Sequence, residues 1–241
     1  MIRIDKYLAD CCIGTRSEVK KYIKAKQITV NGVVVLKPEE KVDETKDAIC
    51  FKGQPISYEK YVYYLFHKPE GCVTAKQDNL HKTVMDYFPE EIRAKDIAPV
   101  GRLDLDTEGL LLMTNDGPLT HHLLSPTHHV PKTYYAILDK EIPADAVEKF
   151  KLGVDIGDEK PTLPAELVIL PVKEQEDECV YSAELTIHEG RFHQVKRMFE
   201  AVGCTVTYLK RLSMGEFTLG TLAKGEYRKL TPEEVGQISA M

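Results

Sequence analysis

The chain has 241 residues, enough for one large domain or for a large and a small one, and its formal net charge is −6. Its six cysteines include no CxxC pair, which favours reduced thiols over zinc binding or disulfides. No apolar run approaches membrane-spanning length, and the N-terminus lacks the apolar core of a signal peptide. We therefore expect a cytoplasmic protein without membrane contact.

Positive charge is concentrated at the front of the chain. Residues 1–37 hold eight Lys and Arg against three Asp and Glu, although acidic residues predominate in the chain as a whole. A basic module on an acidic body indicates that this end of the protein meets a phosphate backbone.

Two short helices are predicted at the N-terminus. Apolar residues recur at three- and four-residue steps from Ile4 to Cys12, which fits an amphipathic helix that ends near Gly14. Thr15 and Glu18 then have the spacing of a capping box, so a second helix should begin there.

The second helix carries a row of positive charge. Arg16, Lys20 and Lys24 recur at four-residue steps on one side of it. Like charges in a row repel one another unless an anion lies opposite, so this face is either an RNA contact or simply solvated. After the helix, the Asn-Gly pair at 31–32 between two β-branched runs predicts a hairpin with a tight type I′ turn.

Together these features resemble the S4 RNA-binding domain, with matching segments at residues 3–8, 15–18 and 28–32. The resemblance covers about residues 2–48 and implies RNA contacts from the basic row and from Arg3 and Lys6. Residues 51–55 are interpreted as leading into a connector. We expect a domain boundary near residue 58, which gives an RNA-binding domain at 1–58 and a larger domain at 59–241.

The second domain begins with an aromatic-rich stretch, residues 61–67, which predicts a strand that the Lys-Pro-Glu-Gly turn at 68–71 terminates. Residues 83–88 fit a short helix.

The stretch from Gly101 to Gly117 joins a charged loop to an apolar run. The loop contains Asp104 and Asp106, and residues 110–114 are short and apolar enough for a strand that is buried on both faces. Such a strand holds the loop rigidly, as a catalytic carboxylate requires. The alternative interpretation is that both Asp residues only form a turn.

The rest of the chain alternates strands with a few helices. We predict helices at 118–124 and 143–150, strands at 132–138, 164–170 and 180–187, and a solvated turn at 174–178. Phe192, Val195, Phe199 and Val202 have the spacing of one helix face, with Gly203 as its C-terminal cap. The absence of regular βαβ spacing favours an α+β fold with a mixed, largely antiparallel sheet.

Two histidine pairs, at 121–122 and 128–129, suggest metal binding at first sight. Adjacent residues of a helix point about 100° apart, so neither pair can easily share one ion. We therefore expect no metal site, and for the second pair an RNA contact is the more natural role.

Three segments resemble the RsuA branch of the pseudouridine synthases: GRLDLDTEGLLLMTNDG at 101–117, KTY at 132–134 and EGRFHQVKRM at 189–198. The resemblance implies that Asp104 is the catalytic carboxylate, that Tyr134 stacks on the target base, and that Lys196 pairs with Asp104 and keeps it ionised. It implies no cofactor. RNA contacts near the site are expected from four further residues: Arg102, Arg191, His193 and Gln194.

The resemblance also implies a reaction and a partner. A uridine in structured ribosomal RNA, or in an assembling ribosomal subunit, would be isomerised by breaking the N1–C1′ bond, rotating the uracil and rejoining it through C5. Residues 110–138 are most similar to members that act on 16S ribosomal RNA at uridine-516, whereas sibling enzymes act on 23S RNA. A monomer is the default expectation.

Two other functions fit parts of the sequence. One is a non-catalytic, S4-type ribosome-assembly factor, which the intact set of Asp104, Tyr134 and Lys196 disfavours. The other is a glycoside hydrolase with Asp104 and Asp106 as its two carboxylates, which the lack of an apparent sugar-binding aromatic platform disfavours.

Overall fold

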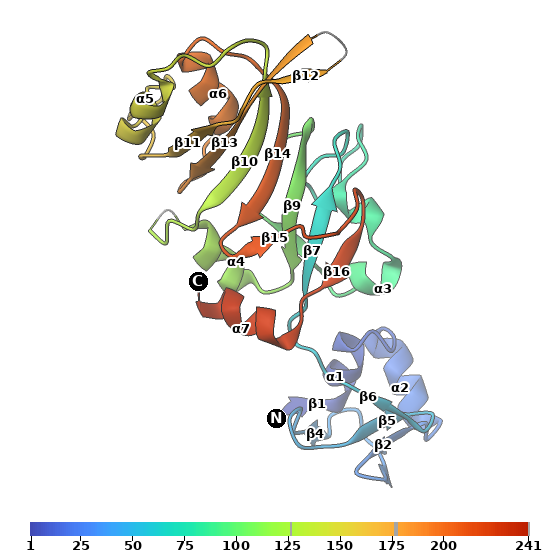
Figure 1. Cartoon of the computed structure of the whole chain (residues 1–241). Coiled ribbons are helices and arrows are strands. Elements are labelled where there is room, and N and C mark those ends of the chain that lie inside the picture. The colour runs from blue at the N-terminus through green and yellow to red at the C-terminus, as the bar shows by residue number, and fades with distance from the viewer. Residues whose placement is uncertain (126, 176–177, 241) are drawn as a thin grey trace. The chain divides into compact units, whose positions relative to one another are not determined.

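A computed structural model describes residues 1–125, 127–175 and 178–240, and Figure 1 labels its elements. The residues group into two compact units, Met1–Val62 with Pro89–Ile97, and Tyr63–Phe88 with Ala98–Met241. Within the described ranges, no helix combines the length and the apolar character needed to cross a membrane.

The first unit packs helices against short strands. Its four-stranded sheet has the order β3-β2-β5-β6, and β1 pairs with β4. The elements are β1 (Ile2–Arg3), α1 (Ile4–Asp10), α2 (Arg16–Lys24), β2 (Ile28–Val30), β3 (Val33–Val34), β4 (Lys41–Val42), β5 (Ile49–Phe51), β6 (Gln54–Ile56) and α3 (Glu90–Arg93). Its buried core consists of Ile4, Tyr7, Leu8, Val19, Ile23, Ile28, Val35, Val42 and Ile49.

The two predicted local signals of this unit are confirmed. Thr15 Oγ1 accepts a hydrogen bond from the Glu18 N–H at 3.3 Å, and Glu18 Oε2 accepts one from the Thr15 N–H at 2.8 Å. Asn31 and Gly32 have φ angles of 51° and 81°, as a type I′ hairpin requires. The capped helix therefore begins where the sequence places it.

The structure of residues 51–55 was not predicted from the sequence, which was interpreted there only as leading into a connector. This stretch belongs to a second hairpin, in which β5 and β6 pair antiparallel. Lys52 and Gly53 form its turn with φ angles of 51° and 78°. A Lys-Gly pair allows the same positive φ angles as Asn-Gly, but is a weaker sequence signal for a turn.

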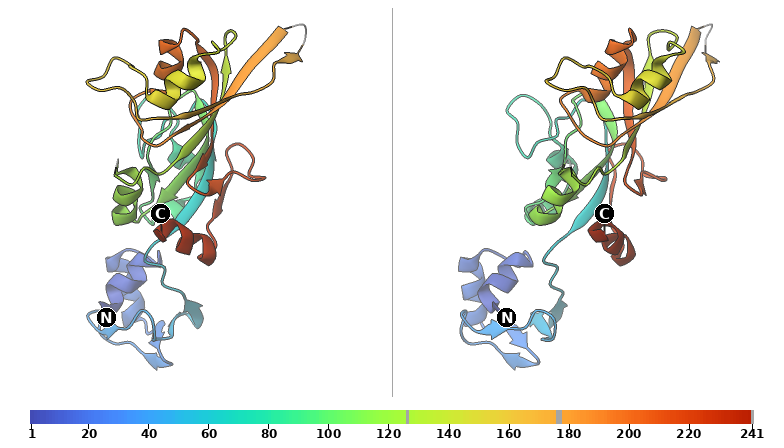
Figure 2. Two further views of the ribbon diagram at one scale, coloured as in Figure 1. Left: turned by 60° about the vertical axis from the view of Figure 1, so that its left-hand side comes forward. Right: turned by 90° about the vertical axis from the view of Figure 1, so that its left-hand side faces the viewer.

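The second unit is built on one large, twisted sheet with the strand order β11-β13-β10-β14-β9-β7-β16 (Figures 1 and 2). Its elements are β7 (Tyr63–Lys68), the 3-10 helix η1 (Val84–Tyr87), β8 (Ala98–Val100), β9 (Thr107–Thr114), α4 (Gly117–Leu124), β10 (Lys132–Leu138), α5 (Ala146–Leu152), β11 (Glu166–Ile169), β12 (Lys173–Gln175), β13 (Glu178–Ile187), α6 (Gln194–Ala201), β14 (Val206–Met214), β15 (Phe217–Thr218), β16 (Tyr227–Lys229) and α7 (Pro232–Ala240).

The sheet is mixed and largely antiparallel, as predicted. Strands β9 and β14 are parallel, and the other pairings along this strand order are antiparallel. At the end of the parallel contact, where Gly109 pairs with Arg211, the two backbones approach closely. A Cβ on Gly109 would lie 2.3 Å from the Arg211 carbonyl oxygen, and Gly109 has a φ of +118°, so only glycine fits.

Strand β9 is buried along all eight residues, which confirms the predicted buried strand and extends it back to Thr107. It therefore begins directly after the loop that carries Asp104 and Asp106. A rigid central strand fixes the end of that loop.

Two details after residue 170 differ from the sequence prediction. Of the solvated turn expected at 174–178, residues 174 and 175 belong to β12 and residue 178 begins β13, whereas residues 176 and 177 are outside the described residues. The prediction that Phe192 shares a buried helix face was wrong. His193, with a φ of 48°, is the residue immediately before α6, so the helix begins only at Gln194 and does not include Phe192. Val195 and Phe199 are buried as predicted, whereas Phe192 is 71% exposed.

Candidate active site

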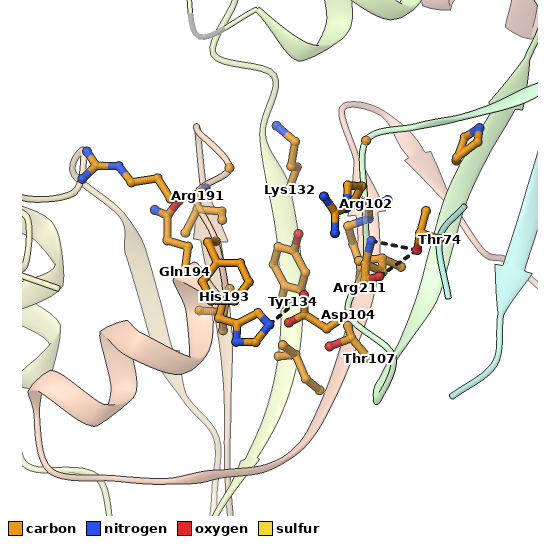
Figure 3. Close-up of a pocket in the computed structure, with 18 of the residues that line it drawn as sticks. Thr74, Arg102, Asp104, Thr107, Lys132, Tyr134, Arg191, His193, Gln194 and Arg211 are labelled. Carbon is orange, nitrogen blue, oxygen red and sulfur yellow. Dashed lines mark hydrogen bonds and ion pairs between the residues drawn. The ribbon is translucent and has the colours of Figure 1, made fainter. Parts of the chain in front are cut away.

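A pocket of about 960 Å³ in the second unit brings together segments that are far apart in the sequence. It is lined by the loop before β9, by residues of β10 and β14, and by the segment that leads into α6. Asp104, Tyr134 and Lys196 all line this pocket. Figure 3 shows the side chains of Asp104, Tyr134 and His193 at its centre.

Lys196 contacts two carboxylates. Its Nζ lies 3.7 Å from Asp104 Oδ2, but only 2.6 and 2.7 Å from the two carboxylate oxygens of Asp106. The hydrogen bond from Lys196 lowers the pKa of Asp106. The sequence placed Lys196 beside Asp104, as the structure does, but it did not single out Asp106 as the closer partner.

His193 lies on the other side of the same carboxylate. Its Nε2 is 3.5 Å from Asp104 Oδ1, and its ring stacks on that of Phe192 with a centroid distance of 3.8 Å and an interplanar angle of 17°. Asp104 is partly exposed, with 30% of its side chain accessible. The carboxylate is thus flanked by two nitrogen groups and remains open to the pocket.

The loop around Asp104 is held by the last residue of β7, Lys68, and by the turn that follows this strand. Lys68 Nζ donates to the carbonyl oxygens of Thr107, Asp104 and Pro69 at 2.8, 2.9 and 3.1 Å. The Gly71 N–H donates to the Leu105 carbonyl at 2.8 Å. A fully buried ammonium therefore holds the backbone on both sides of Asp106.

Thr74 adds a further connection from the same segment. Its hydroxyl donates to the Leu103 carbonyl at 2.7 Å and accepts from the Leu103 N–H at 3.1 Å.

Burial lowers the pKa of Lys68, which is the electrostatic cost of placing a cation there. Sequence reasoning treated Lys68 only as part of a turn; a lysine at the end of an aromatic strand was the available signal.

Two buried cations lie beside Tyr134 in the pocket wall. Because side chains alternate along a strand, Lys132 and Tyr134 share one face of β10. Arg211 comes from the neighbouring strand β14, and its Nε donates to the Leu110 carbonyl at 2.7 Å. Its Nη2 is buried and has no hydrogen-bond partner among the described residues. Lys132 Nζ donates to the Val130 carbonyl at 2.9 Å.

The charge of Lys132 is sensitive to its surroundings. Burial, and then the charge of Arg211, lower the pKa of Lys132 to about 8. Both residues line the pocket, so below that pH the charge of Lys132 adds to that of Arg211 in the wall beside the Tyr134 ring. Neither residue was assigned a role from the sequence: Arg211 lies outside the three recognised segments, and within the KTY segment only Tyr134 was singled out.

The four residues predicted to contact RNA near the site also line the pocket, but they differ in their contacts. Arg102 is exposed. Arg191 donates to Glu189 Oε2 at 2.9 Å and to the carbonyls of Lys160 and Pro161. Gln194 is 4% exposed; its amide nitrogen donates to Glu189, and its amide oxygen accepts from the Arg191 N–H. Arg191 and Gln194 therefore stabilise the segment that leads into α6.

In the first unit, the predicted basic row is fully presented to solvent. Arg16, Lys20 and Lys24 are exposed along α2, and Lys6 is exposed on α1. Arg3 instead pairs with the buried carboxylate of Asp5 at 2.9 and 3.0 Å, and this hydrogen bonding lowers the pKa of Asp5.

The histidine pairs are not arranged as a metal site. The rings of His122 and His128 contact each other in a tilted arrangement, with centroids 3.7 Å apart and an interplanar angle of 39°. Among the residues that the structure describes, no group of three or more His, Cys, Asp or Glu side chains could hold a metal ion.

Comparison with known protein families identifies both units. Residues 62–201 match the RNA pseudouridylate synthase family, and residues 2–49 match the S4 domain. The chain belongs to the RNA pseudouridylate synthase family. It is therefore an enzyme of the class that isomerises uridine in RNA, with an S4 domain in front of the synthase domain as in the RsuA family.

Similar pseudouridine synthases match the chain almost from end to end. It is 43% identical over 236 residues to the uncharacterised RNA pseudouridine synthase YtzG of Bacillus subtilis, with 97% of each chain covered. It is 40% identical to the ribosomal small subunit pseudouridine synthase A of Vibrio cholerae, with 98% of this chain and 99% of the relative covered. The Escherichia coli protein of the same name is 39% identical, with 98% of this chain and 100% of the relative covered.

A solved structure supports the fold of this pseudouridine synthase. A crystal structure of a pseudouridylate synthase matches with a TM-score of 0.68 and 35% sequence identity, covering 99% of this chain and 100% of that chain. The predicted α+β fold, with an S4 domain followed by a synthase domain, is thus confirmed.

Proposed function

We propose that this pseudouridine synthase isomerises uridine-516 of 16S ribosomal RNA. The observation that carries the proposal is the near full-length similarity, at 39–40% identity, to relatives named ribosomal small subunit pseudouridine synthase A. The RNA is bound as free ribosomal RNA or within the assembling small subunit, in the cytoplasm and by a monomer. A 23S RNA target is the alternative within the same family.

We assign the reacting carboxylate to Asp104. Its loop is held by Lys68, Gly71 and Thr74, while its side chain remains accessible from the pocket. Lys196 lies 3.7 Å away and carries the opposite charge. The rigidly placed Asp104 then acts on the flipped nucleotide as nucleophile or base.

Lys196 has a second effect in this proposal. Asp104 and Asp106 are two like charges in one loop, and the ammonium group contacts both. It therefore offsets their mutual repulsion and the repulsion between Asp106 and the RNA backbone. Lys196 therefore contacts the reacting carboxylate of Asp104 and also compensates the negative charge of Asp106.

The base must leave its stack before it can reach Asp104. Unstacking and unpairing cost a few kcal/mol, and stacking on an aromatic ring returns about 1–3 kcal/mol. We assign that ring to Tyr134, which lines the pocket and is 8% exposed. Lys132 and Arg211 beside it supply positive charge for the carbonyl oxygens of uracil or for the phosphate that enters with the nucleotide.

The S4 domain, which we place at residues 1–58, binds the surrounding RNA. Its exposed cations Lys6, Arg16, Lys20 and Lys24 are suited to phosphate groups, which position a protein on RNA without reading its sequence. We also propose RNA contacts from Arg102 and His193 at the pocket.

Mapping of pseudouridines in ribosomal RNA from cells with and without this gene tests the target. The proposal predicts the loss of one pseudouridine, at position 516 of 16S RNA, and its return when the wild-type gene is restored. Loss of a 23S pseudouridine instead would establish the alternative target. An unchanged map, together with impaired ribosome assembly, would favour a non-catalytic assembly factor and contradict the proposal.

A further inference from the structure

Phe192 is exceptional among the aromatic residues of the chain. The sequence has 7 Phe and 12 Tyr, all within the described residues, and Phe192 is the only one that is exposed. Its exposed fraction is 71%. A single exposed apolar side chain is common in proteins and needs no explanation by itself. Its position and its support in this protein are what require one.

Phe192 lines the proposed catalytic pocket. Its ring stacks on that of His193, whose Nε2 is 3.5 Å from Asp104 Oδ1. One face of the Phe192 ring is thus covered by an imidazole, while most of its surface faces solvent. His193 therefore connects the Asp104 carboxylate, which its Nε2 approaches, to the exposed ring of Phe192, on which it stacks.

The backbone of Phe192 is held in place by an ion-paired arginine. Arg197 Nη1 donates to the Phe192 carbonyl at 3.0 Å, and Arg197 Nη2 lies 2.5 Å from Asp158 Oδ1. On the other side of the residue, Arg191 is held by Glu189 and by two backbone carbonyls. The ring is therefore presented by an ordered segment, which lowers the entropy lost when something stacks on it.

We propose that Phe192, backed by His193, is a stacking subsite for an unpaired nucleobase that neighbours the target uridine on the same RNA strand. This inference rests on the proposed function in one respect, namely that the target uridine occupies the pocket beside Asp104. When a nucleotide is flipped into that pocket, its neighbours lose a stacking partner, and single-stranded bases stack on exposed aromatic rings.

The chemistry of the ring defines what the subsite recognises. Phenylalanine has no hydrogen-bonding group, so it reads the flat face of a base and not its edge. The subsite therefore favours any unpaired base, purines above pyrimidines because of their larger rings, over a paired one. It selects the local RNA structure around the target uridine rather than a sequence.

Kinetics of the full chain on an RNA fragment test the subsite, with the fragment chosen to contain the uridine that the mapping identifies. We expect Phe192→Ala to raise KM and the RNA Kd about 5- to 30-fold, which is about 1–2 kcal/mol at 1.4 kcal/mol per factor of ten, with kcat changed less than about threefold. Phe192→Tyr should behave as wild type, and Phe192→Leu should resemble the alanine variant. Leu152→Ala is the control, since Leu152 is 80% exposed on α5 and does not line the pocket.

Abasic RNA shows whether a nucleobase is the ligand. Removing the base on one side of the target should weaken wild-type binding by the same factor as Phe192→Ala, and should have no further effect on that variant. The proposal would be wrong if, at both neighbouring positions, the loss of affinity caused by the abasic site multiplied with the loss caused by Phe192→Ala. It would also be wrong if Phe192→Ala bound the RNA as the wild type does. A wild-type enzyme that makes no pseudouridine in the RNA would instead contradict the proposed function.

Discussion

Replacing Lys68 by methionine tests how the catalytic loop is held. Methionine is close to lysine in length and apolar, so it fills the buried space but donates no hydrogen bond. Three backbone carbonyls then lose their donor, those of Thr107, Asp104 and Pro69. We expect the loop that carries Asp104 to open more often and turnover to fall.

The size of the effect follows from the contacts. A hydrogen bond from a charged donor contributes about 1.5–3 kcal/mol, and a buried carbonyl left without a donor costs about 1–3 kcal/mol. Relief from burying the ammonium offsets part of this loss, because an uncompensated buried charge costs several kcal/mol. We expect the free energy of opening of the loop to fall by about 3 kcal/mol, which corresponds to roughly 10²-fold faster exchange of its amides.

Hydrogen exchange followed by mass spectrometry measures this opening directly in peptides that cover residues 101–108. The kcat for tritium release from 5-tritiated uridine in RNA is measured in parallel and should fall by up to about 10²-fold, because a catalytic group that is misplaced by about 1 Å can cost that much. Lys151→Met is the matched control, since Lys151 is exposed on α5. Unchanged exchange and unchanged kcat in Lys68→Met would refute the idea that Lys68 holds the loop.

Three further predictions concern the cations of the protein. Lys196→Met should lower kcat at least about 10²-fold and change RNA affinity far less. Asp106→Asn should retain activity within about tenfold, because Lys196 still faces Asp104 in that variant. Equal losses of kcat and RNA affinity in Lys196→Met would show that Lys196 is only a phosphate contact. The pKa of Lys132 is lowered to about 8, so its side chain is charged below that pH and loses its proton as the pH rises through it. RNA affinity should therefore fall above pH 8 in the wild type and vary less with pH in Lys132→Met. Binding titrations from about pH 6.5 to about 9.5 measure this difference. Lys20→Gln and Lys24→Gln should each reduce the slope of log Kd against log salt by about 0.7–0.9, and an unchanged slope would remove that lysine from the RNA interface.

Much of the fold was predictable because its signals are local. The capping box of Thr15 and Glu18, the Asn-Gly hairpin and the buried strand β9 each follow from a few neighbouring residues. The segment before α6 was not predictable in this way. The left-handed conformation of His193 breaks a periodicity that the sequence continues through Phe192, and nothing in the apolar spacing indicates it.

The site was predictable only in part for a related reason. Asp104, Tyr134 and Lys196 lie in recognisable segments, and the structure brings them to one pocket. The roles of Lys68 and Arg211 depend on contacts across strands, with the carbonyls of Asp104 and Leu110 as their acceptors. A sequence read in order does not reveal which backbone oxygens a distant cation will reach.

Turnover by Asp104→Asn tests the central assignment most directly. Asparagine has nearly the same shape, and the loop contacts of Lys68 go to backbone oxygens, so the variant should fold and bind RNA as the wild type does. We predict that it releases no tritium above background from 5-tritiated uridine in RNA. Isomerisation at the wild-type rate by this variant would contradict the role of Asp104 as the reacting carboxylate.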